Sequence, residues 1–67
     1  MNTALDIPAE AARIQARLLE MGQTPTELCR RVGCSPVQWY RWREGISEPR
    51  MRAWDKVRRT FDEMTTE

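Results

Sequence analysis

With 67 residues and a formal net charge of +1, the chain is long enough for one small domain but too short for a deep cleft or a large cofactor. It has no histidine, the side chain most often used for proton transfer near neutral pH and for metal binding. Its two cysteines have a spacing that matches no zinc motif. We therefore expect no enzyme activity, no metal, no cofactor and no small-molecule ligand.

The first eight residues contain neither a basic segment nor an apolar run of the length found in signal peptides and membrane spans. We therefore expect a cytoplasmic protein with no membrane partner. Cys29 and Cys34 both fall on apolar positions of a helical pattern, which predicts two reduced thiols in the core. A disulfide between them, or a redox switch that acts through them, is the alternative.

The charged side chains are unevenly distributed along the chain. Residues 1–29 carry a net charge of −2, residues 30–59 carry +6 and residues 60–67 carry −3. Ten of the eleven basic residues are arginine, whose planar group of donors matches phosphate and guanine. The central segment could therefore contact a nucleic acid, or its arginines could simply form the solvated faces of helices.

Prolines at positions 8, 25, 36 and 49, with glycines at 22, 33 and 45 ahead of the last three, divide the chain into short helices. A first helix is predicted from about Pro8 to Met21, capped by Asp6, because apolar residues repeat at helical spacing. A second helix is predicted to follow Thr24. Glu27 stands three residues after that threonine, where it would complete a capping box.

A third helix is predicted from its cap Ser35 to Glu44, with Pro36 at its first position. A fourth helix follows Pro49, and its apolar stripe consists of Met51, Trp54, Val57 and Phe61. A flexible polar tail over about 62–67 completes a single domain that spans residues 1–67. No segment alternates like a strand, so the predicted fold class is all-α.

The second and third predicted helices are joined by only Gly33, Cys34 and Ser35. A link this short, with a glycine able to adopt a positive φ, sets two helices at a steep angle, as in a helix-turn-helix. The predicted motif covers about residues 24–44. Its core is expected to consist of Leu28, Cys29, Val32, Gly33, Cys34, Trp39 and Trp42.

The segment TPTELCRRVGCSPVQWYRWREGISEP carries leucine, glycine, serine, a large apolar residue, glycine and proline at the spacing of a known family. These residues are Leu28, Gly33, Ser35, Trp42, Gly45 and Pro49. Over about residues 10–61 the chain thus resembles the phage repressor and Cro type of helix-turn-helix proteins, also called the XRE family. The resemblance implies a lambda-repressor-like domain of four or five helices. The family commonly has alanine, isoleucine and glutamate where this chain has Cys29, Trp39 and Arg43.

Helical geometry places Trp39 and Trp42 on one face of the third helix and Val37, Tyr40, Arg41 and Glu44 on the other. The resemblance implies that this helix lies in the major groove of DNA. Its base-contacting residues would then be Pro36, Val37, Tyr40 and Arg41, with Arg41 bonded to guanine and the apolar residues against thymine methyl groups. The phosphate backbone would be contacted by Thr24, Thr26, Gln38 and Arg50.

Several of these side chains also have a simpler structural interpretation. Tyr40 could cover the edge of the core, and Arg43 is expected to form an ion pair within the chain or to be solvated. For the basic residues of the fourth helix, the simpler role is a solubilising surface; they are Arg52, Lys56, Arg58 and Arg59.

The resemblance implies a sequence-specific, double-stranded DNA-binding transcriptional regulator, a small dimeric repressor of phage or mobile-element origin on a palindromic operator. We expect the homodimer surface on the fourth helix and the residues before Pro49, because Trp54 and Phe61 are hard to bury fully in so small a core. The alternative is a protein-interaction module, an antitoxin or an adaptor with the same fold. The modest net charge and the number of aromatic residues favour that alternative.

Overall fold

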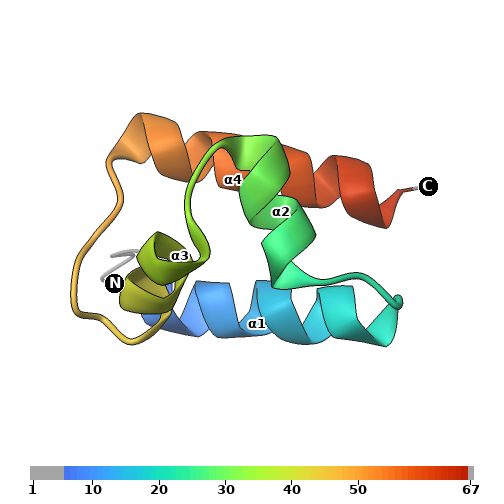
Figure 1. The fold of residues 1–67 in the computed structure, drawn as a ribbon, viewed down its shortest axis with the longest axis horizontal. Coiled ribbons are helices and arrows are strands. Elements are labelled where there is room, and N and C mark those ends of the chain that lie inside the picture. Colours follow the sequence, from blue (N-terminus) through green and yellow to red (C-terminus); the bar gives the residue numbers. More distant parts are fainter. Residues whose placement is uncertain (1–5, 67) are drawn as a thin grey trace, which may run out of the picture.

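A computed structural model describes residues 6–66, which fold into four helices and no strand. The helices are α1 (Ile7–Glu20), α2 (Pro25–Val32), α3 (Pro36–Arg43) and α4 (Met51–Thr65). In Figure 1, α1 and α4 form the two long sides of the molecule, and α2 and α3 lie between them. Helix α3 packs mainly on α1, and α2 packs mainly on α4. The prediction of an all-α fold is therefore confirmed for this part of the chain.

Helix α1 begins one residue before the predicted start. The Asp6 carboxylate accepts a hydrogen bond of 3.2 Å from the backbone N–H of Ala9, so Asp6 is the cap that the sequence indicated. The helix ends at Glu20, and Gly22 adopts a positive φ of 77° in the turn that follows.

Helices α2 and α3 each begin at the predicted hydroxyl cap and at a proline. Thr24 Oγ1 accepts from the N–H of Glu27 at 3.2 Å, and Ser35 Oγ accepts from the N–H of Gln38 at 3.0 Å. The reciprocal half of the predicted capping box is missing, because the Glu27 carboxylate binds two arginines on its own helix instead. Helix α3 ends at Arg43, one residue before the predicted end.

The link between α2 and α3 is a left-handed turn at Gly33. Its φ of 95° is one that other residues adopt only with strain, and the N–H groups of Gly33 and Cys34 both donate to the carbonyl oxygen of Cys29. These two bonds, of 2.8 and 3.0 Å, satisfy a carbonyl that the end of a helix would otherwise leave without a partner. Gly33 itself is exposed and Cys34 is half-buried, so only part of the predicted motif core is internal.

Helix α4 differs most from the prediction. Met51 is 71% exposed, so it does not belong to the apolar stripe, and the helix continues to Thr65 instead of giving way to a flexible tail at 62. Met64 is fully buried, and its carbonyl oxygen accepts a hydrogen bond of 2.7 Å from Gln23 Nε2. The stripe therefore runs one turn further than predicted, through the buried Thr60. Residue 67 lies outside the described residues.

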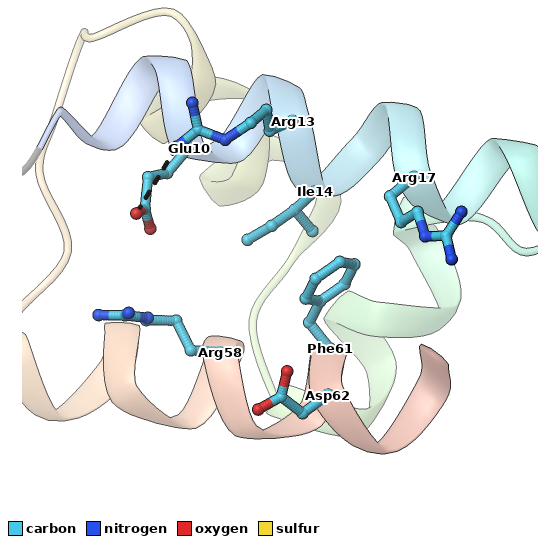
Figure 2. Close-up of a pocket in the computed structure, with 7 residues that line it drawn as sticks. All are labelled: Glu10, Arg13, Ile14, Arg17, Arg58, Phe61 and Asp62. Carbon is cyan, nitrogen blue, oxygen red and sulfur yellow. Dashed lines mark ion pairs between the residues drawn. The ribbon is translucent and has the colours of Figure 1, made fainter. Parts of the chain in front are cut away.

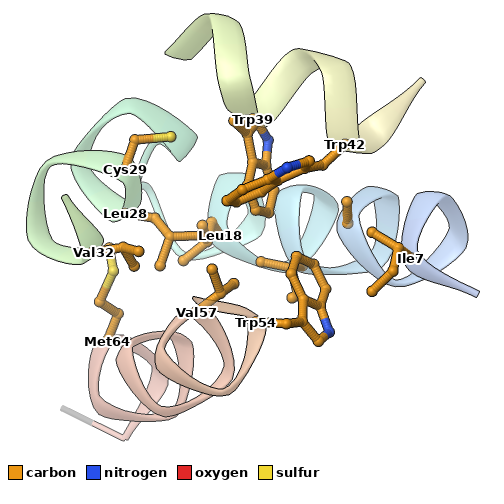
Figure 3. Packing of buried hydrophobic residues seen from close by; sticks show 12 residues of the cluster. Ile7, Leu18, Leu28, Cys29, Val32, Trp39, Trp42, Trp54, Val57 and Met64 are labelled. Carbon is orange, nitrogen blue, oxygen red and sulfur yellow. The ribbon is translucent and has the colours of Figure 1, made fainter. Parts of the chain in front are cut away.

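Three tryptophans form the centre of the core. Trp39 stacks on Trp54 with the ring centroids 6.1 Å apart (Figure 3). Trp42 meets both rings edge-on, with its centroid 6.4 Å from that of Trp39 and 6.2 Å from that of Trp54. Trp39 and Trp42 are each 3% exposed, which confirms the predicted inner face of α3. The remaining motif residues predicted for the core are also buried, namely Leu28, Cys29 and Val32.

Two of the indole N–H groups find partners on α1. Trp39 Nε1 donates to Gln15 Oε1 at 3.1 Å, and Trp54 Nε1 donates to Glu10 Oε1 at 3.2 Å. Because both polar ends are satisfied, the rings can be buried without leaving a donor unpaired. Trp54 is accordingly 1% exposed, so the expectation that it is hard to bury and contributes to a dimer surface is wrong.

Candidate nucleic-acid interface

The outer face of α3 is open to solvent. Pro36, Val37, Tyr40 and Arg41, the four residues predicted to contact bases, are all exposed. The guanidinium group of Arg41 makes no hydrogen bond or ion pair within residues 6–66, so its donors are free for an external acceptor. The tryptophans hold the opposite face of the same helix, and this outer face is therefore presented by a rigid element.

Tyr40 and Arg43 pack against each other on the flank of α3. The Arg43 guanidinium carbon lies 5.4 Å from the centroid of the Tyr40 ring, and Tyr40 is 49% exposed. Arg43 Nη1 also donates to Gln15 Oε1 at 3.0 Å, and its Nε donates to Glu44 Oε2 at 3.2 Å. Arg43 thus has an intramolecular role, as the sequence indicated, and Tyr40 lies over Arg43 and outside the core.

The start of α2 offers fewer backbone donors than its position suggests. Pro25 has no N–H, and the N–H of Glu27 donates to Thr24 Oγ1. Within residues 6–66, the N–H of Thr26 is then the donor of the first turn that has no partner. Thr24 and Thr26 are both exposed. A phosphate at this end of α2 would therefore meet one backbone donor and two hydroxyl groups.

Glu27 neutralises part of the positive charge on α2. Its Oε2 lies 2.6 Å from Arg30 Nη2 and 2.9 Å from Arg31 Nε. The hydrogen bonds from Arg30 and then Arg31 lower the pKa of Glu27 to about 2. Two of the nine basic residues in the central segment are therefore committed to an ion pair within their own helix.

A groove between the α2–α3 turn, α3 and the start of α4 is lined by three of the six basic residues that form no ion pair within residues 6–66. It has a volume of about 330 Å³, and its lining includes the buried Val32 and Trp42. Gln38 and Arg50, two predicted phosphate contacts, both line it, whereas Thr24 and Thr26 do not. Arg52 and Lys56 line it as well, although the sequence indicated only a solubilising role for them. Within residues 6–66 these three cations form no ion pair.

The sequence contained one signal for this groove, the density of basic residues after position 49. It did not show which of them lie on one side of α4. Arg52 and Lys56 are four residues apart, so they share a helix face, and Arg58 lies on another face beside α1. Among residues 6–66 no side chain caps the first turn of α4, so its N–H groups have no side-chain acceptor there, beside the groove that Ala53 helps to line.

A second hollow, between α1 and α4, has a different character. It measures about 370 Å³, and Ile14 and Phe61 form its apolar part (Figure 2). Its charged side chains are of both signs: Glu10, Arg13, Arg17, Arg58 and Asp62. The Glu10 carboxylate forms an ion pair with Arg13 at 3.8 Å and accepts a hydrogen bond from the indole N–H of Trp54. This mixed environment fits a phosphate backbone less well than the groove between α3 and α4 does.

The chain matches no protein-family model, no curated protein and no solved structure. Among residues 6–66 there is no cluster of three potential metal-binding side chains. None of the helices in the described range combines the length and the apolar character needed to cross a membrane.

Proposed function

We propose that this chain is a sequence-specific, double-stranded DNA-binding regulator that uses α2 and α3 as a helix-turn-helix of the lambda-repressor type. The observation that carries the proposal is the outer face of α3, where the unpaired Arg41 stands beside exposed Val37. Arg41 would donate two hydrogen bonds to the O6 and N7 atoms of a guanine, and Val37 and Pro36 would contact thymine methyl groups.

The groove between α3 and α4 supports the same proposal from its charge. A duplex whose major groove received α3 would bring a phosphate strand toward the rim of that helix. Gln38 and Arg50 lie there, and Arg52, Lys56 and the uncapped start of α4 add further donors. These contacts would position the protein without selecting a sequence.

A dimer is part of the proposal, because one helix contacts too few base pairs to single out an operator. Two copies on a palindromic site would place their α3 helices about 34 Å apart. Ile46, 65% exposed, and Met51, 71% exposed, are apolar side chains open to solvent before and after Pro49 in the chain, where the sequence indicated a dimer contact. By occupying a promoter in this way, a chain of this size would act as a repressor.

The same two exposed apolar side chains favour the second candidate, a protein-interaction module such as an antitoxin or an adaptor. Ile46 and Met51 would then contact a different protein. Selection of bound sequences from a random pool of DNA duplexes separates the two candidates. A DNA-binding regulator enriches a palindrome, whereas an interaction module enriches nothing.

Salt dependence tests the groove with a matched pair of variants. Arg52 and Arg58 are exposed arginines on the same helix, but only Arg52 lines the groove. Arg52→Gln should lower the slope of log K against log salt by about 0.9, the value for one phosphate contact, and Arg58→Gln should leave it unchanged. If both variants reduce the slope equally, only net charge matters and the groove has no special role.

A further inference from the structure

Cys29 and Cys34 occupy the two ends of the turn that closes α2. The N–H of Cys34 donates to the carbonyl oxygen of Cys29 at 3.0 Å, with the left-handed Gly33 between them. This hydrogen bond limits the separation of the two Cα atoms to roughly 7 Å. Disulfides bridge Cα atoms that are about 4.4–6.8 Å apart. At helix ends of this type a contact between these two side chains is frequent, and here both of them are thiols.

The two thiols differ in accessibility. Cys29 is 1% exposed, whereas Cys34 is half-buried and lines the groove between α3 and α4. Burial, followed by the charge of Cys34 and a hydrogen bond with it, raises the pKa of Cys29 to about 12. A reagent from solvent therefore meets Cys34 first, and Cys29 remains protonated behind it.

The groove also determines which reagents come close to Cys34. Arg50, Arg52 and Lys56 line it, and among residues 6–66 no carboxylate lines it with them. An anionic reagent is therefore attracted and a cationic reagent is repelled, to an extent that salt reduces. Glutathione disulfide, with its carboxylates, is a small disulfide of the anionic class.

We propose that Cys29 and Cys34 form a dithiol–disulfide pair, in which Cys34 reacts first with an anionic small-molecule disulfide and Cys29 then closes the bond. In the first step the Cys34 thiol loses its proton to solvent, and its sulfur attacks one sulfur of the reagent. One thiolate leaves, and Cys34 holds the other half as a mixed disulfide. In the second step Cys29 loses its proton and attacks the Cys34 sulfur, which expels the second thiolate. Two protein thiols are oxidised, and one disulfide is reduced to two thiols.

The second step is expected to be the slower one. A mixed disulfide removes the Cys34 thiol and with it both of its contributions to the raised pKa of Cys29, but burial, the largest cause, remains. Closure should therefore accelerate as the pH rises, because a larger fraction of Cys29 is then thiolate.

The test is a time course of the full chain with glutathione disulfide, stopped with acid and followed by mass spectrometry. The wild type should pass through a single adduct on Cys34 and end as a monomer that has lost two hydrogen atoms. Cys29→Ala should stop at the adduct, and Cys34→Ala should remain unmodified while folded. Accumulation of a stable adduct in the wild type, or of covalent dimers, overturns the proposal. Because the wild type alone gives this result, the conclusion does not depend on the folding of the variants.

The role of the groove is tested with a cationic disulfide, cystamine, and with two variants. Added salt should slow adduct formation by glutathione disulfide and should not slow adduct formation by cystamine. Arg52→Gln should slow the reaction with glutathione disulfide severalfold, and Arg58→Gln should not. An identical response of the two reagents to salt would contradict the selection of an anionic reagent. None of these measurements requires DNA, so their outcome is independent of the proposed regulatory function.

Discussion

Trp39 of α3 stacks on Trp54 of α4 with ring centroids 6.1 Å apart and ring planes inclined by 16°. Their indole N–H groups donate in turn to Gln15 and Glu10 of α1. One pair of rings thus joins the candidate recognition helix to both long helices of the domain. The orientation of the outer face of α3, and with it the position of Arg41, depends on this aromatic contact.

Replacement of Trp42 tests how much the aromatic cluster around this pair stabilises the domain. Trp42→Ala removes a side chain that packs edge-on against both other rings, and it should lower the free energy of unfolding by about 3–5 kcal/mol. A loss of this size is comparable with the whole stability of so small a domain. Urea denaturation followed by circular dichroism measures it. Tyr40→Ala, on the exposed side of the same helix, should cost much less. If Trp42→Ala stays folded and loses only its DNA affinity, Trp42 contacts the DNA and its assignment to the inner face of α3 is wrong.

Arg41 and Arg50 should respond differently to the same substitution. Arg41→Ala should weaken specific binding by about 1–3 kcal/mol and relax the preference at one base pair of each half-site. Arg50→Ala should weaken binding to all sequences alike, because a phosphate contact carries no sequence information. Binding to a set of single-base operator variants distinguishes the two patterns.

Arg17→Ala is the control for that comparison. Arg17 is an exposed arginine of α1 that pairs with Glu20 at 3.3 Å, away from the α3 face. The substitution Arg17→Ala removes the same charge, and it should change neither the affinity for DNA nor the base preference. If Arg41→Ala and Arg50→Ala both weaken binding to all operator variants equally, Arg41 contacts phosphate and does not read a base.

Met64 tests the length of α4. Met64→Ala should lower the free energy of unfolding by about 2–5 kcal/mol, because its side chain is fully buried. Glu63→Ala, at the exposed neighbouring position, should change it by less than about 0.5 kcal/mol. Thermal or urea unfolding of both variants gives the comparison. Equal and small effects would mean that the chain after position 62 is a mobile tail after all.

Glu27 gives stability a defined dependence on pH. Its pKa is lowered from 4.5 to about 2 in the folded chain, so its ion pair with Arg30 and Arg31 is fully stabilising above pH 4.5. This stabilisation should decrease as the pH falls from 4.5 toward 2, because the folded carboxylate then takes up a proton. The free energies of unfolding of Glu27→Gln and of the wild type should therefore become equal as the pH falls across this range. Added salt should shrink the difference at neutral pH, since the pair is solvent-exposed.

Local chemistry was enough to predict where most helices begin. Asp6, Thr24 and Ser35 accept the backbone bonds expected of caps, because a cap depends only on residues three positions away. Helical periodicity likewise placed Trp39 and Trp42 on the inner face of α3, and left Arg41 outside. Caps and helix faces depend on residues within one or two helical turns of each other, so the sequence alone is enough to predict them.

Burial and clustering that depend on a neighbouring helix could not be predicted from the sequence. Trp54 is buried because Glu10 of α1 accepts its N–H, and Met64 is buried at the end of α4, where its carbonyl binds Gln23. Met51 has the same apolar character and was assigned to the same stripe from its spacing, but it remains exposed. Periodicity assigns an apolar residue to a face, and only the packing of another element decides whether that face is covered. The grouping of Gln38, Arg50, Arg52 and Lys56 around one groove arose in the same way, from the approach of α4 to α3 across residues that are distant in the chain.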